Sequence, residues 1–232
     1  MKPDALAAEE ERLRSVYGSP TWDKWHTGYD KARVFFVQEQ ERALLDLLRR
    51  TGLSSLGDRR VLEVGCGNGR ALRDLVRWGV KPGQVTGVDL LPARLHEARR
   101  DCAPGVRLLQ ANGARLPFRD AAFDVVMQFT VFTSILDEDV RRAVAGEMQR
   151  VLRPGGVIIW YDYFAPSPNP NVRAVRKREL RALFPGWTIE ARRVTLAPPL
   201  ARPLAERAWW LGALLGRVPL LRTHYLAAIH RP

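Results

Sequence analysis

The stretch VLEVGCGNGR, residues 61–70, places three glycines at alternate positions directly after a short apolar run. The apolar run is typical of a buried strand, and the residues after the glycines favour a helix. A glycine-rich turn from a first strand into a helix is typical of a nucleotide or nucleoside site in a doubly wound sheet. The third glycine of the dinucleotide fingerprint would fall at Arg70, and no Gly-Lys-Ser/Thr of a P-loop follows.

Outward from this stretch, strands and helices alternate. We expect strands at 60–64, 84–89, 106–110, 123–129 and 157–161, followed by two more at 187–196 and 225–230. Helices are predicted at 68–78, 93–102, 138–152 and 172–184, and two precede the first strand, at about 3–17 and 31–50. Near-continuous apolar strands separated by helices predict an α/β fold, with a seven-stranded, mostly parallel sheet covered by helices on both faces.

Composition narrows the class of protein. The chain has 232 residues and a net charge of +12, and no apolar run approaches the roughly 18 residues that cross a bilayer. Two cysteines make no disulfide framework, and no group of side chains has metal-ligand spacing, so we expect a cytoplasmic protein without a metal. The positive charge is scattered arginine, which is either a field for anions or a compositional bias; we expect no specific nucleic-acid partner.

Asp89 ends the second predicted strand, twenty residues after Gly69. An acid at this place can accept hydrogen bonds from both hydroxyls of a ribose. The pattern therefore favours a ligand that carries a ribose and disfavours a pyrophosphate.

Four segments in register resemble the class I S-adenosylmethionine-dependent methyltransferases, in particular the methyltransferase type 11 group with its ubiquinone/menaquinone methyltransferase-like enzymes. They are VLEVGCGNGR (61–70), VTGVDLLPARL (85–95), GARLPFRDAAFDVVMQ (113–128) and EMQRVLRPGGVIIW (147–160). The resemblance spans about residues 58–161. It implies a Rossmann-like sheet whose last strand is antiparallel, and S-adenosylmethionine as cofactor.

The resemblance also implies roles for single residues. The glycines let the backbone lie against the amino-acid end of the cofactor, Glu63 helps to orient its ammonium, Asp89 binds the ribose and Leu90 packs on the adenine. Asn112 stands where the family often has Asp, and its carbonyl oxygen can still accept from the adenine amino group. The cofactor-binding residues expected in this way are Glu63, Gly65, Cys66, Gly67, Gly69, Asp89, Leu90, Asn112, Gly113 and Gln128.

Two of these residues have simpler interpretations, because Leu90 can belong to the core and Gln128 can cap its strand. The catalytic group is less defined still. Methyl transfer depends largely on orientation and water exclusion, and a base is needed only where the nucleophile must lose a proton. Related enzymes often carry a histidine after the fourth strand, where this chain has Thr133 and Ser134.

We therefore expect Asp162, after the fifth strand, or His224, at the start of the last strand, to act as the base. His26 in the aromatic connector is a weaker candidate. Structural interpretations stand beside each: Asp162 can cap a turn, His224 can be a satisfied core histidine, and His26 can lie on the surface.

A single domain is predicted, in three parts. Residues 1–57 form a helical lid that includes Tyr17, Trp22, Trp25 and Tyr29, although simple packing on the sheet explains them equally well. Residues 58–161 bind the cofactor, and 162–232 form the acceptor side, with a helical insert at 198–222. Pro203 and Pro219 bracket one expected insert helix that holds Trp209 and Trp210; it is a substrate roof, a dimer contact or a shallow membrane contact.

The sequence thus favours a methyltransferase with a small-molecule acceptor, first a hydroxyl of a sugar or lipid-linked glycan. A quinone-type ring or a secondary metabolite is the alternative acceptor, and charge alone favours RNA. A nicotinamide oxidoreductase is disfavoured by Arg70, and a non-catalytic protein that binds the cofactor remains a further alternative. The protein is expected to be a monomer or a homodimer.

Overall fold

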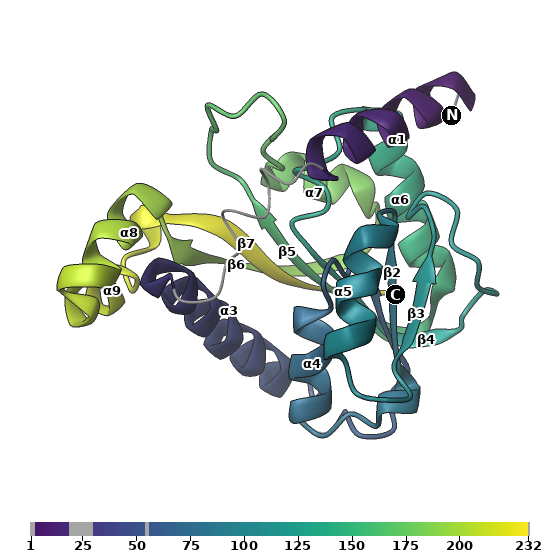
Figure 1. Cartoon of the computed structure of the whole chain (residues 1–232), viewed down its shortest axis with the longest axis horizontal. Coiled ribbons are helices and arrows are strands. Elements are labelled where there is room, and N and C mark those ends of the chain that lie inside the picture. The colour runs from purple at the N-terminus through teal and green to yellow at the C-terminus, as the bar shows by residue number, and fades with distance from the viewer. Residues whose placement is uncertain (1–2, 19–29, 54–55, 232) are drawn as a thin grey trace.

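The computed structural model describes residues 3–18, 30–53 and 56–231. Its centre is a seven-stranded sheet in the order β3-β2-β1-β4-β5-β7-β6 (Figure 1). The bounds are β1 Val61–Val64, β2 Val85–Asp89, β3 Arg107–Gln110, β4 Phe123–Phe129, β5 Leu152–Tyr163, β6 Thr188–Leu196 and β7 Arg222–His230. Only β7 runs antiparallel to its two neighbours, β5 and β6, so the predicted fold and the antiparallel last strand are confirmed.

Helices cover both faces of the sheet. One apolar core packs α3 (Lys31–Arg50), α4 (Arg70–Arg77) and α5 (Pro92–Asp101) against it, through residues such as Leu47, Leu72 and Leu95. The other core lies under α1 (Pro3–Tyr17), α6 (Glu138–Val151) and α7 (Lys177–Leu183), with Met148 and Leu180 among its members. The 3-10 turn η1 (Pro82–Gln84) leads into β2.

The strand order reverses between β1 and β4, which are parallel neighbours. At such a switch point the connections leave in opposite directions, and a crevice opens at the carboxyl ends of the strands. Because β7 runs the other way, its first residues lie at this same edge, where His224 pairs with Tyr163 at the end of β5. The topology therefore directs the ends of β1, β2, β4 and β5 and the start of β7 to one site.

The insert at 198–222 differs from its prediction. It forms two helices, α8 (Pro198–Arg207) and α9 (Trp209–Leu215), and a 3-10 turn, η2 (Pro219–Leu221). Pro203 lies inside α8 and does not bracket a helix, and the break comes at Ala208, whose backbone is not helical (φ −150°, ψ 63°). The three elements pack beside α3 and form one end of the molecule's long axis (Figure 1).

None of the helices in the described part of the chain is both long enough and apolar enough to cross a membrane. The boundaries proposed at 57/58 and 161/162 stay a prediction.

A substitution at Gly69 tests how closely the turn after β1 packs on α5. It has φ +75°, and a Cβ atom there would lie 2.6 Å from Cys102 Sγ and 3.2 Å from Ala98 Cβ on α5. We expect Gly69→Ala to cost about 1 kcal/mol for the left-handed backbone and ~1–3 kcal/mol more for the overlap with α5. Urea unfolding measures the sum.

Gly155→Ala is the matched control, because Gly155 has φ +70° and no atom within 4 Å of a Cβ there. It isolates the backbone cost. Equal losses of stability in the two variants would contradict the close packing of the first turn on α5.

Candidate active site

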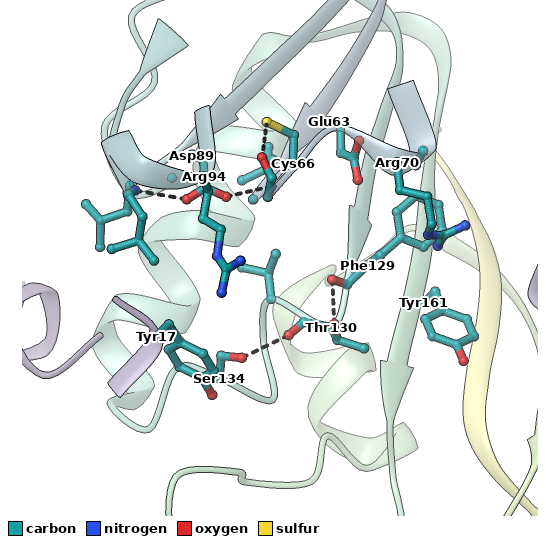
Figure 2. Close-up of a pocket in the computed structure, with 18 of the residues that line it drawn as sticks. Tyr17, Glu63, Cys66, Arg70, Asp89, Arg94, Phe129, Thr130, Ser134 and Tyr161 are labelled. Carbon is teal, nitrogen blue, oxygen red and sulfur yellow. Dashed lines mark hydrogen bonds between the residues drawn. The ribbon is translucent and has the colours of Figure 1, made fainter. Parts of the chain in front are cut away.

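A cavity of about 590 Å³ opens at the carboxyl edge of the sheet. Its floor comes from the ends of β1, β2, β4 and β5 and from the start of β7, and α1, α3 and α8 contribute its walls. Figure 2 shows side chains from these separate parts of the chain pointing into one space. Residues from 6 to 224 meet here, so the site exists only in the folded chain.

The glycine turn forms one side of the cavity. The amides of Gly65 and Cys66 both donate to the Val88 carbonyl, at 2.8 and 2.9 Å, which joins the turn to the end of β2. Gly65 and Gly67 have positive φ (71° and 53°); a Cβ at Gly65 would overlap the Val131 side chain, whereas one at Gly67 would meet nothing within 4 Å. Gly67 therefore leaves open space that a ligand can approach.

Gly69 has a different role from the other two glycines. It is not among the residues that line the cavity, and the atoms that exclude a side chain there belong to α5. Its placement favours packing of α4 on α5 over the predicted contact with the cofactor. Cys66 lines the cavity, and burial raises the pKa of its thiol, which keeps the sulfur neutral.

Glu63 is the least compensated side chain of the site. It is 3% exposed, and its Oε2 atom has no hydrogen-bond partner among the described residues. Burial raises the pKa of this carboxyl to about 8, although the nearby Arg70 opposes the shift. Arg70 donates to Asp74 at 3.1 Å and to Gln40, and Glu63 points toward the cavity (Figure 2). A buried acid without a partner calls for a cationic ligand.

Asp89 lies across the turn from Glu63. Its Oδ2 accepts from the Gly67 amide at 2.8 Å, and its Oδ1 accepts from the Leu91 amide at 2.9 Å. Burial raises the pKa of the carboxyl, and these two amides act against that rise. Each carboxylate oxygen keeps a second lone pair, so Asp89 can still accept from ligand hydroxyls.

The next part of the cavity is flanked by Leu90, Asn112 and Gly113, all of which line it. Asn112 Oδ1 accepts from the Ala114 amide at 2.9 Å, and its Nδ2 donates to Glu10 on α1 at 3.0 Å. The side chain that was expected to meet an adenine thus also attaches the N-terminal helix to the site.

Helix α1 forms a wall of the cavity through Leu6, Glu9, Glu10, Leu13 and Tyr17. The helix therefore covers the half of the cavity that contains Glu63 and Asp89, here named the cofactor half. That it moves as a lid stays a prediction. Trp22, Trp25, His26 and Tyr29 of the aromatic connector lie outside the described residues.

Two predicted residues lie beneath the site and do not line it. Gln128 accepts from the Val131 amide at 3.0 Å and donates to the Tyr161 carbonyl at 3.3 Å. Asp162 accepts from the amides of Phe132 and Thr133, at 3.0 and 3.3 Å. Burial raises its pKa to about 6, against the opposing effect of these bonds. Neither is among the cavity's lining residues, and both hold the loop after β4, so their placement favours positioning over direct contact.

His224, by contrast, lines the cavity. Its ring stacks on Tyr161 with centroids 4.8 Å apart, and its Nδ1 lies 3.1 Å from Thr223 Oγ1. Burial lowers the pKa of the imidazole to about 3, so the ring is neutral at physiological pH. Of the two predicted bases, His224 lines the cavity and Asp162 does not.

Sequence reasoning missed several residues around His224. Phe129, Thr130, Tyr161 and Thr195 line this half, and the Tyr161 hydroxyl lies 2.8 Å from Thr195 Oγ1. The ends of β4 and β5 could have indicated Phe129 and Tyr161, since ligands bind at the carboxyl ends of parallel strands. No sequence signal marks Thr195, which comes to the cavity from β6.

Comparison with known proteins shows which family the sequence resembles. Residues 61–156 match the model of a family described as "Methyltransferase domain". The phthiotriol/phenolphthiotriol dimycocerosates methyltransferase of Mycobacterium tuberculosis is 37% identical over 59% of this chain and 48% of its own length. An O-methyltransferase of Aspergillus nomiae is 33% identical over 53% of this chain and 55% of that protein. The chain thus spans about half the length of the curated relatives it matches.

Among solved structures, an S-adenosylmethionine-dependent methyltransferase from Mesorhizobium loti superposes with a TM-score of 0.59 at 21% identity. The match covers 80% of this chain and 96% of that one, and at this identity it bears on the fold. The predicted methyltransferase family is confirmed for residues 61–156, and the predicted Rossmann-like fold is confirmed for the described part of the chain. The site fits S-adenosylmethionine, the predicted cofactor: Glu63 is a buried acid without a hydrogen-bond partner for Oε2, which the ammonium would ionise and pair, and Asp89 offers acceptors for the ribose.

Glu63→Gln removes the charge and keeps the shape of the side chain. We expect the variant to bind S-adenosylmethionine about ten- to a hundredfold more weakly, since a charged hydrogen bond contributes ~1.5–3 kcal/mol. In calorimetry, wild-type affinity should rise with pH up to about 8, because the ammonium requires the ionised acid. The variant should lose that dependence.

The stability of the ligand-free protein should fall as pH rises, whereas its affinity for the cofactor should increase. The carboxyl's pKa is raised from 4.5 to about 8 by folding, so the stability it contributes is fully present below pH 4.5 and is lost as pH rises through about 8. Relative to wild type, Glu63→Gln should therefore gain stability between pH 5 and pH 8. Glu190→Gln, at an exposed position of β6, is the control. Unchanged cofactor affinity in Glu63→Gln would contradict the assignment.

Proposed function

We propose that this chain, whose residues 61–156 match a methyltransferase domain, is an S-adenosylmethionine-dependent methyltransferase that transfers a methyl group to a hydroxyl of a lipid or lipid-linked glycan. The observation that carries the proposal is a neutral histidine, His224, in the same cavity as Glu63 and Asp89. A hydroxyl loses a proton when it is methylated, and His224 is a side chain that can receive it.

The half of the cavity around His224, here named the acceptor half, has a lining that favours an apolar acceptor. Thr130, Thr195 and Arg202 line it beside His224, and its apolar and aromatic lining consists of Phe36, Phe129, Tyr161 and Pro198. Two curated relatives point the same way, one named as a methyltransferase of phthiotriol dimycocerosates and the other as an O-methyltransferase. A quinone-type ring would also fit apolar walls. Methylation at a ring carbon, however, would require the base to remove a proton from carbon and not from oxygen.

When bound, S-adenosylmethionine supplies an electrophilic methyl carbon that the acceptor oxygen displaces from sulfur. Glu63 would hold its ammonium and Asp89 its ribose, and these two contacts would orient the cofactor in the cavity. Helices α1 and α8 enclose the cavity from the two sides and limit the access of water. The acceptor's proton becomes strongly acidic as its oxygen gains the methyl group, so an imidazole of low pKa is a sufficient base.

We assign the tautomer of that imidazole from the hydrogen bonds of Thr223, which can either donate to Nδ1 or accept from it. Thr223 Oγ1 donates to the Thr195 carbonyl at 3.5 Å, so it has a lone pair free to accept from Nδ1–H of His224 at 3.1 Å. This arrangement leaves Nε2 unprotonated and able to take the proton. Tyr161, stacked on the ring, holds its plane in position. Asp162 and Gln128 act one step away, because they position the loop after β4.

Product analysis tests the reaction. The purified protein is incubated with S-adenosylmethionine carrying a deuterated methyl group and, in separate reactions, with a cell lipid extract, a polar metabolite extract and RNA. We expect the label in the lipid fraction, on oxygen, as shown by mass spectrometry and by NMR of the isolated product. Label on carbon, on nitrogen or in RNA would overturn the proposal.

His224→Gln tests the base. We expect turnover to fall by about 10²–10⁴, with cofactor affinity nearly unchanged because His224 belongs to the acceptor half. His230→Gln is the matched control, since His230 lies at the other end of β7 and does not line the cavity. Wild-type turnover should not follow an imidazole titration between pH 5 and pH 8, because the pKa of His224 is about 3. Full activity in His224→Gln would contradict the role of His224 as base. Catalysis would then depend on the positioning of the acceptor and the cofactor alone.

A further inference from the structure

We propose that the outer surface of residues 198–221, here named the apolar tip, docks on the headgroup region of an anionic lipid bilayer. The tip comprises α8, α9 and η2 and forms one end of the molecule (Figure 1). It is separate from the cofactor half of the cavity, and it is an interaction surface that the methyltransferase reaction itself does not require.

Exposed apolar side chains are concentrated at this tip. Among the described residues, five of the seven large apolar side chains that are exposed fall between positions 200 and 220. Trp210 is 71% exposed and Leu220 is 83% exposed. The other three are Leu200, Leu214 and Val218. Such a concentration on one surface of a monomer marks an interaction site.

Helix α9 explains why these side chains cannot turn inward. Its sequence, WWLGALL, contains no polar residue. The inner side already packs on α3: Trp209 meets Phe35 edge to face, with centroids 5.1 Å apart, and a Cβ on Gly212 would lie 3.2 Å from the Phe35 ring. Trp210 and Leu214, four residues apart on one side of α9, therefore remain outside. A helix that is apolar on all sides is unsuited to water on its outer side.

Charge selects the partner. Between 198 and 221 the chain has three arginines, Arg202, Arg207 and Arg217, and a single acid, Glu206. All three arginines are exposed, and the whole chain carries +12. A tryptophan and leucines flanked by arginines suit the interface of an anionic bilayer, where basic groups meet lipid phosphates. A second copy of this chain would bring the same positive charges against one another.

The tip is also connected to the acceptor half. Pro198 and Arg202, at the start of α8, line the cavity, while η2 leads into β7 and so to His224. Docking at the tip would hold the acceptor half close to the bilayer. This consequence, unlike the docking itself, rests on the proposed lipid acceptor.

Sedimentation with vesicles tests the docking without cofactor or acceptor. The full chain is mixed with vesicles of equal parts phosphatidylglycerol and phosphatidylcholine, and with vesicles of phosphatidylcholine alone. We expect binding to the first and little to the second. The double variant Trp210→Ser/Leu220→Ser should bind on the order of tenfold to a hundredfold more weakly, because two large apolar side chains no longer enter the interface. Leu45→Ser, at a 38% exposed position of α3, is the matched control and should bind like wild type.

Two further variants test the role of charge. Arg217→Gln should weaken binding to the anionic vesicles about fivefold. Arg107→Gln, at an exposed position of β3 on the opposite edge of the sheet, should change it much less. Trp210→Phe keeps an apolar ring; it should retain binding but lose part of the tryptophan quenching that brominated lipids cause in wild type.

Equal vesicle binding by wild type and Trp210→Ser/Leu220→Ser would overturn the proposal. So would a wild-type dimer, seen by analytical ultracentrifugation, that the same double variant dissociates. Docking without methylation of any lipid would refute only the proposed acceptor. Methylation of a detergent-dispersed lipid without vesicle binding would refute only the docking.

Discussion

The Val88 carbonyl accepts two hydrogen bonds, from the amides of Gly65 and Cys66, and the arrangement of the site depends on this junction. It turns the chain sharply at the end of β1 and holds the turn against the end of β2. Asp89, the next residue along β2, can then accept from the Gly67 amide. Without these bonds the turn would not leave the open face at Gly67, and Glu63 and Asp89 would not lie at the same cavity.

A second constraint is the electrostatic character of the cavity. Glu63 is buried without a partner for Oε2, and His224 is enclosed and neutral. The burial of Glu63 costs free energy in the ligand-free protein, since its Oε2 atom has no hydrogen-bond partner, and burial likewise disfavours the charged form of His224. In the proposed function, the cofactor's ammonium would ionise and pair Glu63 at one end of the cavity, and the acceptor would give its proton to His224 at the other. Asp162 and Gln128, which do not line the cavity, are instead hydrogen-bonded to the loop after β4.

Sequence reasoning located the right edge of the sheet but not always the right face. The apolar strands and four motifs in register were enough to predict the fold, and they singled out Glu63 and Asp89, which line the cavity. Asp162 follows Tyr161 in β5, and neighbouring residues of a strand point to opposite faces. Aromatic residues stand on both sides of this pair, at Trp160 and Tyr163, so no polar alternation revealed which face meets the cavity.

Gly69 could not be assigned from the sequence either, because its neighbours Cys102 and Ala98 come from a distant part of the chain, at and near the end of α5. The same limit applied to Pro203, whose place inside α8 depends on the packing of α8 against α3.

Two threonines indicate that backbone strain is concentrated in the acceptor half. Thr130 and Thr195 have φ of 59° and 64°, a conformation that β-branched residues rarely adopt, and both line the cavity. Compensating bonds hold each in place. The Thr130 amide donates to the Tyr161 carbonyl at 2.8 Å, and the Thr195 hydroxyl pairs with the Tyr161 hydroxyl at the same distance. Tyr161 thus supports both strained residues and stacks on His224. Strain retained in this way is typical of functional sites, where the surrounding structure fixes a geometry that the local chain would not choose. The acceptor half is therefore held rigid around Tyr161, just as the cofactor half is organised by the glycine turn.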